Sequence, residues 1–160
     1  IRSLGLQKYG YVLSVGRFVE EKGFDLLMNA FGKMRLNNIH LLIAGDADHE
    51  TEYSKKIKEL AKTHDIILPG YVKGEKLQEI FSHARLFVLP SYNEGLPISI
   101  LEAMSYNLPL LVSDIPANKQ IALEDHQFFI SGSEESLIEK LENQLKYEFK
   151  PVMYLSLIHI

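Results

Sequence analysis

LFVLPSYNEGLPISILEAMSY, residues 86–106, is the stretch of sequence that decides the fold. It begins with a four-residue apolar run that Pro90 ends, which is typical of a buried β-strand. Pro97 stands where a first-turn proline belongs in a helix over residues 98–106, and Asn107, which tolerates left-handed backbone angles, ends that helix. A buried strand, a polar loop and a helix in this order form the repeating unit of an α/β domain.

The same order recurs along the whole chain. Apolar runs predict strands at residues 11–15, 40–44, 66–68, 86–89, 110–112 and 127–130. Apolar residues at three- and four-residue spacing predict helices at residues 24–35, 53–62, 77–84, 98–106, 118–123 and from Ser133 onward. Strands that are nearly continuous apolar runs, separated by helices, indicate a parallel sheet covered on both faces. We therefore predict a doubly wound, Rossmann-like α/β domain with about six strands.

The composition is that of one globular domain. The chain has 160 residues, of which 46% are hydrophobic and 24% charged, as in ordinary folded proteins. Its net charge of −4 predicts no nucleic-acid partner. The lack of cysteine excludes a disulfide framework and a thiolate metal site, and we expect a cytoplasmic protein. The sequence has no run of about eighteen apolar residues, so we expect no segment that spans a bilayer.

The loop after the first predicted strand carries two cations between glycines. It reads Gly16-Arg17-Phe18-Val19-Glu20-Glu21-Lys22-Gly23. An arginine forks onto two phosphate oxygens, a lysine adds a mobile point charge, and glycine lets the backbone approach a ligand, so the loop suits a diphosphate. The alternative is a solvated loop in which Arg17 and Lys22 pair with Glu20 and Glu21. The loop is not a dinucleotide fingerprint, because no G-x-G-x-x-G follows the strand.

The loop after the strand at residues 86–89 contains Gly95 and runs into a helix. A glycine loop at a helix start presents free amide donors and the positive end of the helix dipole, which together form an anion site. Glu94 precedes the helix and Glu102 lies one to two turns inside it, where the two carboxylates suit the hydroxyls of a ribose and of a sugar. The alternative is that Glu102 faces solvent and Glu94 satisfies the amides at the helix start.

Four motifs, in this order and spacing, resemble the C-terminal half of a retaining glycosyltransferase of family 4 with the GT-B fold. They lie within about residues 11–144 and are Val15-Gly16-Arg17 with Glu21-Lys22-Gly23, Ala44-Gly45-Asp46, Leu68-Pro69-Gly70-Tyr71-Val72, and Leu89-Pro90-Ser91 through Glu94-Gly95 to Leu101-Glu102-Ala103-Met104. The resemblance implies a sheet that forms one half of a GT-B enzyme. It also implies transfer of a hexose from a nucleoside-diphosphate sugar to an acceptor hydroxyl, with retention at the anomeric carbon.

The resemblance implies a donor site made of Gly16, Arg17, Lys22, Tyr71, Val72, Glu94, Gly95, Leu96 and Glu102. The two cations hold the diphosphate and Glu102 takes the ribose hydroxyls. Glu94 lies by the donor sugar with the amides of Gly95 and Leu96, whereas Tyr71 and Val72 border the base. Glu94, Arg17 and Lys22 are the expected catalytic residues, because cations and amides placed beforehand stabilise the charge on a departing nucleoside diphosphate. No cofactor and no metal are implied, and a UDP-sugar is favoured over a GDP-sugar.

The sequence departs from the family pattern at two places. Ala47-Asp48 stand where the family commonly has a second glycine, which leaves one loop contact open, and Asn107 replaces a glycine whose backbone conformation it can adopt. The cluster of Asp46, Asp48, His49 and Glu50 is more typical of a wet turn at a strand end than of a metal site. The six histidines show no metal-binding spacing.

We expect residues 1–150 to form the donor domain and residues 151–160 to be an apolar tail of unknown role. The first residue is Ile1 rather than Met, and we expect a piece of a longer protein whose N-terminal acceptor domain is absent here. That domain would bind an acceptor glycan or glycolipid, in bacterial-type cell-surface polysaccharide or glycolipid synthesis, and could associate with the inner face of the membrane. The fragment alone is therefore expected to be inactive.

Two other function classes stay open. The first is a non-catalytic α/β nucleotide-binding or signalling module, such as a receiver-like domain. A receiver needs acidic residues after its first strand to hold magnesium, where this chain has Arg17. The second is a dinucleotide-dependent oxidoreductase, which the missing glycine fingerprint disfavours.

Overall fold

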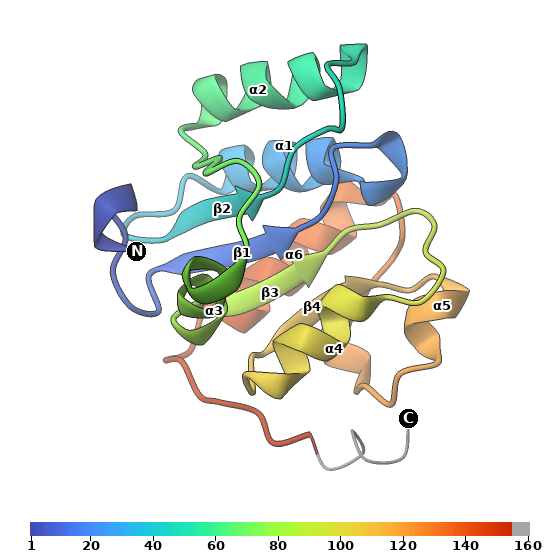
Figure 1. Ribbon diagram of the computed structural model, residues 1–160. Coiled ribbons are helices and arrows are strands. Elements are labelled where there is room, and N and C mark those ends of the chain that lie inside the picture. Colours follow the sequence, from blue (N-terminus) through green and yellow to red (C-terminus); the bar gives the residue numbers. More distant parts are fainter. Residues whose placement is uncertain (155–160) are drawn as a thin grey trace.

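Five parallel strands form the centre of the structure (Figure 1). The structure is a computed structural model and describes residues 1–154. The strands are β1 Tyr11–Val15, β2 His40–Ala44, β3 Leu86–Leu89, β4 Leu110–Ser113 and β5 Phe128–Phe129. They pair in the order β2-β1-β3-β4-β5, and every pair is parallel. The predicted doubly wound parallel sheet is therefore confirmed.

The prediction of about six strands was wrong by one. The segment at residues 66–68 makes only an isolated bridge, in which Ile67 pairs with Leu42 on the outer side of β2. Ile67 uses both main-chain groups in that bridge, donating to Leu41 and accepting from Ile43. Pro69 follows two residues later and has no N–H to continue the ladder, so the segment stays too short to count as a strand.

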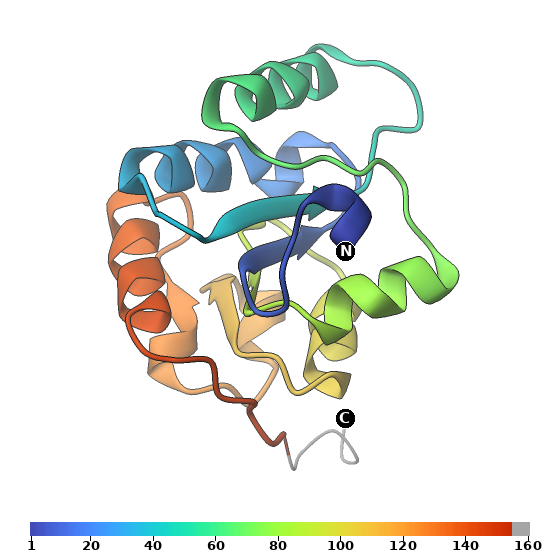
Figure 2. The ribbon, with the colours of Figure 1, turned by 90° about the vertical axis from the view of Figure 1, so that its left-hand side faces the viewer.

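Helices cover both faces of the sheet. The α-helices are α1 Phe24–Met34, α2 Glu52–His64, α3 Gly74–Ser82, α4 Ile98–Ser105, α5 Pro116–Lys119 and α6 Glu134–Leu145, and three 3₁₀ turns are η1 Arg2–Leu4, η2 Glu20–Lys22 and η3 Asp125–Gln127. Figure 2 shows α1 and α6 on one face of the sheet and α3 and α4 on the other, and α2 packs on the outside of α1. Within residues 1–154 no helix is both long enough and apolar enough to cross a membrane.

Strand β3 shows how the two cores arise from the alternation of side chains along a strand. Leu86 and Val88 belong to the buried cluster on the side of α1 and α6. Phe87 and Leu89 belong to the cluster on the side of α3 and α4. All four are at most 1% exposed, and burying a large apolar side chain stabilises a fold by about 1.5–3 kcal/mol. The sheet is therefore fixed from both sides, and its loops start from rigid positions.

Three helix predictions needed correction. The helix expected at residues 77–84 is α3, which begins earlier, at Gly74, and ends at Ser82. Pro97 is the N-cap of α4 rather than a residue of its first turn, although Asn107 does take a left-handed conformation just beyond the helix. The helix expected at residues 118–123 begins earlier, at Pro116, and ends at Lys119. Its first residue is a proline, whose fixed φ suits a helix start, and this signal outweighed the apolar spacing farther along.

The C-terminal segment folds back onto the domain up to Tyr154. Phe149 stacks on Tyr9 with ring centroids 4.1 Å apart. The Val152 amide donates to the Asn107 carbonyl at 2.9 Å, and the Tyr154 hydroxyl donates to the Leu108 carbonyl at 2.6 Å. The first part of the tail expected at residues 151–160 thus packs against the end of α4, and its remainder lies outside the described residues.

Candidate functional site

The order of the strands places the loops after β1 and β3 beside each other. The chain passes from β1 outward to β2 and then returns to the other side of β1 for β3, so these two loops flank the point where the winding direction changes. In sheets of this type ligands bind at that point, beyond the carboxyl ends of the strands. The loops that the sequence singled out are therefore the ones that the fold brings together.

Close backbone contacts hold the two loops against each other. The Tyr92 amide donates to the Glu21 carbonyl at 2.7 Å. Gly23 has a φ of +67°, and a Cβ atom there would lie 2.3 Å from the Pro90 carbonyl oxygen, so only glycine fits. In the same way a Cβ on Gly45 would lie 1.9 Å from the carbonyl oxygen of Gly16, which joins the loop after β2 to the loop after β1.

Lys22 and Glu94 form an ion pair across the joined loops. The Lys22 Nζ lies 2.7 Å from the Glu94 Oε1, and the Ser91 hydroxyl donates to the same oxygen at 2.6 Å. The Glu94 side chain is only 8% exposed and that of Lys22 22%. The Lys22 stem lies along Gly16, because a Cβ on that glycine would be 3.4 Å from its Cδ and Cε. A lysine and a carboxylate of the predicted site are therefore in direct contact, on a surface partly removed from water.

The partners that the two alternatives gave to Arg17, Lys22 and Glu94 were wrong. Lys22 pairs with Glu94, and Arg17 pairs with Asp48, rather than either cation pairing with Glu20 or Glu21. Glu94 accepts from two side chains and not from the amides at the start of α4. The fold supplies the cations with partners that are distant in sequence: Glu94 from the loop after β3 pairs with Lys22, and Asp48 from the loop after β2 pairs with Arg17.

A cavity of about 490 Å³ lies where the chain leaves β1, β2 and the bridge segment, and Gly16 of its lining lies next to the Lys22 stem. Four of the predicted site residues line it, namely Gly16, Arg17, Tyr71 and Val72. Tyr71 is 78% exposed, so its ring is available to a flat ligand, whereas Val72 is buried. The cavity therefore combines an apolar wall and an aromatic ring with two cations, Arg17 and Lys73, and two carboxylates, Asp46 and Asp48.

Arg17 is largely exposed at this cavity. Its Nη1 lies 3.5 Å from the Asp48 Oδ2, and both side chains are more than half exposed. Such a pair contributes about 0–1 kcal/mol and is easily exchanged for another anion. Ala47 and Asp48, where the sequence departs from its expected pattern, both line the cavity, as does Lys73, which sequence reasoning missed.

Glu102 lies on α4 as a half-buried carboxylate. Burial raises the pKa of this carboxyl above its ordinary value, and no residue of the described part donates a hydrogen bond to it. The amides of Gly95 and Leu96 likewise have no acceptor within residues 1–154, and Leu96 is 69% exposed. The Glu102 carboxylate and the two amides therefore have hydrogen-bonding capacity that the described residues do not use, and a ligand could use it.

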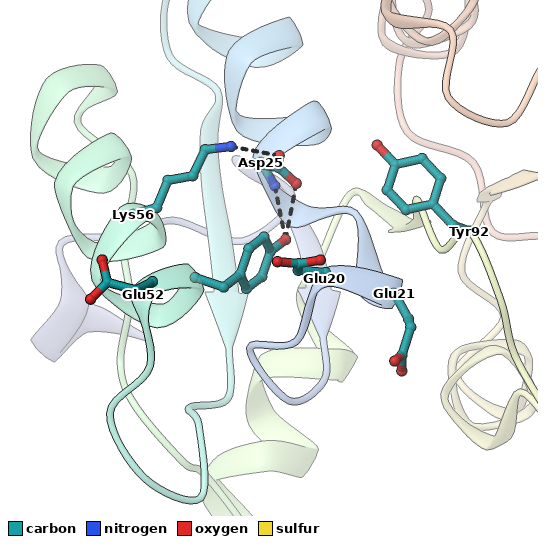
Figure 3. A pocket seen from close by; sticks show the side chains of 7 residues that line it. Glu20, Glu21, Asp25, Glu52, Lys56 and Tyr92 are labelled. Carbon is teal, nitrogen blue, oxygen red and sulfur yellow. Dashed lines mark hydrogen bonds and ion pairs between the residues drawn. The ribbon is translucent and has the colours of Figure 1, made fainter.

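A second, larger hollow of about 740 Å³ lies between the starts of α1 and α2 (Figure 3). Its lining includes four carboxylates and one ammonium, and its residues are Glu20, Glu21, Asp25, Glu52, Tyr53, Lys56 and Tyr92. The Tyr53 hydroxyl and the Lys56 ammonium converge on the Asp25 carboxylate at 3.0 and 3.1 Å. Since the net charge of the lining is negative, the hollow repels a diphosphate, and size alone does not make it the site.

The predicted residues fall into three groups in the structure. One cavity is lined by Gly16, Arg17, Tyr71 and Val72. The second group is the ion pair of Lys22 and Glu94, and it adjoins the cavity at Gly16, which lies next to the Lys22 stem. The third group follows Glu94 on the loop and on α4, and consists of Gly95, Leu96 and Glu102. Within residues 1–154 no three His, Asp or Glu side chains gather as a metal site would need. The hydroxyl of Ser91 was missed, although Ser91 stands inside the motif that was recognised.

The chain matches a known family over nearly its whole length. Residues 2–154 match the sequence profile of a family described as glycosyl transferases group 1. The amylovoran biosynthesis glycosyltransferase AmsD of Erwinia amylovora is 28% identical over 141 residues, which cover 87% of this chain and 39% of that protein. The chain spans only 28% to 39% of the length of three curated relatives that it matches.

Solved structures share the fold. The catalytic domain of cholesterol-α-glucosyltransferase from Helicobacter pylori superposes with a TM-score of 0.74 at 27% identity, covering 86% of this chain and 87% of that one. HepE from Anabaena, solved in complex with UDP, superposes with a TM-score of 0.79 at 17% identity, covering 91% of this chain and 41% of that one. The predicted GT-B fold is confirmed by these likenesses.

Proposed function

We propose that this chain, which belongs to the group 1 glycosyl transferases, is the domain that binds a nucleoside-diphosphate sugar and helps to transfer its hexose to an acceptor hydroxyl. One observation carries the proposal: the loops after β1 and β3, clamped together, present Arg17 and Lys22 with Glu94 beside a cavity of nucleoside size. We place the chain in family 4 and at the C-terminal half of its enzyme.

The donor would occupy the cavity and the clamped loops together. Tyr71 and Val72 would border the base, and the diphosphate would lie between the Arg17 guanidinium and the Lys22 ammonium. Glu102, a carboxylate without a donor from the described residues, would accept from the ribose hydroxyls. Glu94 would accept from hydroxyls of the sugar. The diphosphate, the ribose and the sugar of the donor thus each have a complementary group in the site.

The same groups would lower the barrier of the transfer. The bond between the anomeric carbon and the β-phosphate oxygen breaks and its electron pair stays on the diphosphate. The acceptor oxygen bonds the anomeric carbon, and its proton passes to an oxygen of the departing diphosphate. Negative charge grows on the diphosphate as the first bond breaks, and Arg17, Lys22 and the amides of Gly95 and Leu96 would stabilise it from fixed positions. We infer retention at the anomeric carbon from the proposed membership in family 4. From the same membership we infer that the reaction needs no cofactor and no metal.

The choice of donor and acceptor is also a proposal. We favour a UDP-sugar, since HepE of the same fold was solved with UDP, and a polysaccharide or glycolipid acceptor, since AmsD is named for amylovoran biosynthesis. The acceptor would be bound by a further domain, because relatives are much longer than this chain. Residues 1–150 alone would then bind nucleotide and turn over little sugar.

A thermal-shift panel with UDP, GDP and ADP tests the donor site. A ligand at about 100 times its dissociation constant stabilises the folded state by roughly 2.7 kcal/mol, which raises the melting temperature of a domain of this size by about 5–10 °C. We predict that one of the three nucleotides, UDP first, gives such a shift, and that Arg17→Ala and Lys22→Ala each reduce it.

Lys62→Ala is the matched control, because Lys62 is an exposed lysine on α2 that pairs with Glu59 away from the site. It should leave the nucleotide shift at its wild-type value. The proposal fails if none of the three nucleotides shifts the melting temperature, or if Lys62→Ala reduces the shift as much as Lys22→Ala does.

A further inference from the structure

A row of buried polar groups leads from α5 through the end of β4 to the loop that carries Glu94. Ser91, Ser113 and Asn118 are all 0% exposed. Burying such groups costs free energy unless they are hydrogen-bonded, and the rest of β4 is apolar. Ser113 at the end of β4 and the buried Asn118 on α5 therefore need hydrogen-bond partners, and these partners indicate what the two residues do.

Hydrogen bonds join these groups in series, and each group donates to the next one toward Glu94. The Asn118 amide nitrogen donates to the Ser113 carbonyl at 3.0 Å and to the Ser113 hydroxyl at 3.2 Å. The Ser113 hydroxyl donates to the Ser91 carbonyl at 2.5 Å, and the Ser91 hydroxyl donates to the Glu94 Oε1 at 2.6 Å. The row ends on the carboxylate that also holds Lys22.

Both donors of that carboxylate reach the same oxygen. Ser91 and Lys22 bond Oε1 of Glu94, so Oε2 has no donor among residues 1–154. Fixing one carboxylate oxygen from two directions sets the orientation of the other, since the group is planar. A carboxylate oriented in this way can accept from a sugar hydroxyl without first losing its rotational freedom.

We propose that Ser91 is a positioning residue that orients the Glu94 carboxylate toward the donor sugar, and that Ser113 and Asn118 hold the Ser91 main chain for this task. The inference rests on the proposed function, because the sugar-facing role of Glu94 comes from there. Ser91 itself does not touch the donor.

Ser91→Ala tests the positioning directly, without any ligand. In a chain labelled with ¹³C at the glutamate carboxyl carbons, the Glu94 signal is identified by its loss in Glu94→Gln. We expect Ser91→Ala to move this signal at neutral pH, and Ser113→Ala to move it in the same direction by less. Ser14→Ala is the matched control, since Ser14 is also 0% exposed and its hydroxyl donates to the Val88 carbonyl at 2.7 Å, in the sheet. A Glu94 signal that stays in place in Ser91→Ala overturns the proposal.

Calorimetric titration with UDP and with UDP-glucose tests the consequence for binding. A hydrogen bond to a charged group is worth enough that Ser91→Ala should weaken UDP-glucose about tenfold, while UDP, which has no sugar for Glu94, should change less than about threefold. Ser14→Ala should change neither. Equal losses for both probes would mean a merely structural role for Ser91 and overturn the proposal.

The two measurements separate this inference from the proposed function. If the wild-type chain binds neither UDP nor UDP-glucose, the proposed donor fails, whereas the carboxyl signal still decides whether Ser91 orients Glu94. If the wild-type chain binds both probes but the Glu94 signal does not move in Ser91→Ala, the proposed donor site is supported and the positioning role of Ser91 is overturned.

Discussion

Glu102 combines a position suited to a ligand with an environment that opposes its charge. Burial raises the pKa of its carboxyl above the ordinary 4.5 in the folded chain only. As pH rises above 4.5, the folded state therefore holds this proton more tightly than the unfolded state, and this group lowers the free energy of unfolding. We predict that Glu102→Gln matches the wild type near pH 4 and is the more stable protein at pH 7, measured by urea unfolding across that range.

Glu139→Gln provides the control for that comparison, because Glu139 is exposed on α6. Glu139→Gln should not reproduce the gain in stability that we expect of Glu102→Gln at pH 7. A Glu102→Gln chain that is less stable than the wild type at pH 7 would show that Glu102 has stabilising partners that this account lacks.

A second prediction at the residue scale concerns the ribose. If Glu102 accepts from the ribose hydroxyls, Glu102→Ala should weaken UDP by about tenfold, the loss expected for hydrogen bonds to a charged group. Inorganic pyrophosphate has no ribose, and its affinity should stay within about twofold of the wild-type value. Titration calorimetry measures both, and an equal loss for the two ligands would remove the assignment of Glu102 to the ribose.

The charged residues of the candidate site stood out in the sequence, but their partners in the fold did not. Arg17, Lys22 and Glu94 stood out because cations and carboxylates followed buried strands. The partner of Lys22 is 72 residues away along the chain and that of Arg17 is 31 residues away. Such pairs depend on which strands become neighbours, and local patterns do not contain that information. Ser91 was missed for a different reason: it lies only three residues before Glu94, but the motif does not show that its hydroxyl donates to that carboxylate.

At the scale of elements, the contact between the loops after β1 and β3 sets the site. Gly23 has a φ of +67°, which costs a residue with a Cβ about 1–2 kcal/mol, and its added Cβ would meet the Pro90 carbonyl at 2.3 Å. We predict that Gly23→Ala lowers the free energy of unfolding by about 2–4 kcal/mol and the melting temperature by roughly 5–12 °C.

Gly5→Ala separates strain from collision. Gly5 has a similar φ of +72°, but an added Cβ there would meet nothing within 4 Å. It should cost only the left-handed strain of about 1–2 kcal/mol. If Gly23→Ala is no more destabilising than Gly5→Ala, the two loops are not in the contact described here. Calorimetric scanning of both variants decides between these outcomes.

The elements themselves were largely readable from the sequence. The runs at residues 11–15, 40–44 and 86–89 became β1, β2 and β3 with the predicted bounds, because buried parallel strands are continuous apolar runs. The start of α2 was missed by one residue: Thr51 caps the helix in a reciprocal pair with Ser54. The segment at residues 66–68 failed as a strand, since a single bridge depends on its neighbour and not on its own composition.

At the scale of the whole molecule, the proposed donor site lies at the carboxyl ends of the parallel strands. The acidic hollow between α1 and α2 is larger, at about 740 Å³ against about 490 Å³, yet its charge disfavours a diphosphate. The smaller cavity is lined by Arg17 and Lys73 together with Asp46 and Asp48, so its lining lacks the excess negative charge that opposes a diphosphate.

A crystal structure of the chain with UDP tests this claim most directly. The account predicts the uracil beside Tyr71 and Val72, and diphosphate oxygens within hydrogen-bonding distance of the Arg17 guanidinium and the Lys22 ammonium, with the Arg17–Asp48 pair opened. UDP bound in the hollow between α1 and α2, or bound without contact to either cation, would contradict it.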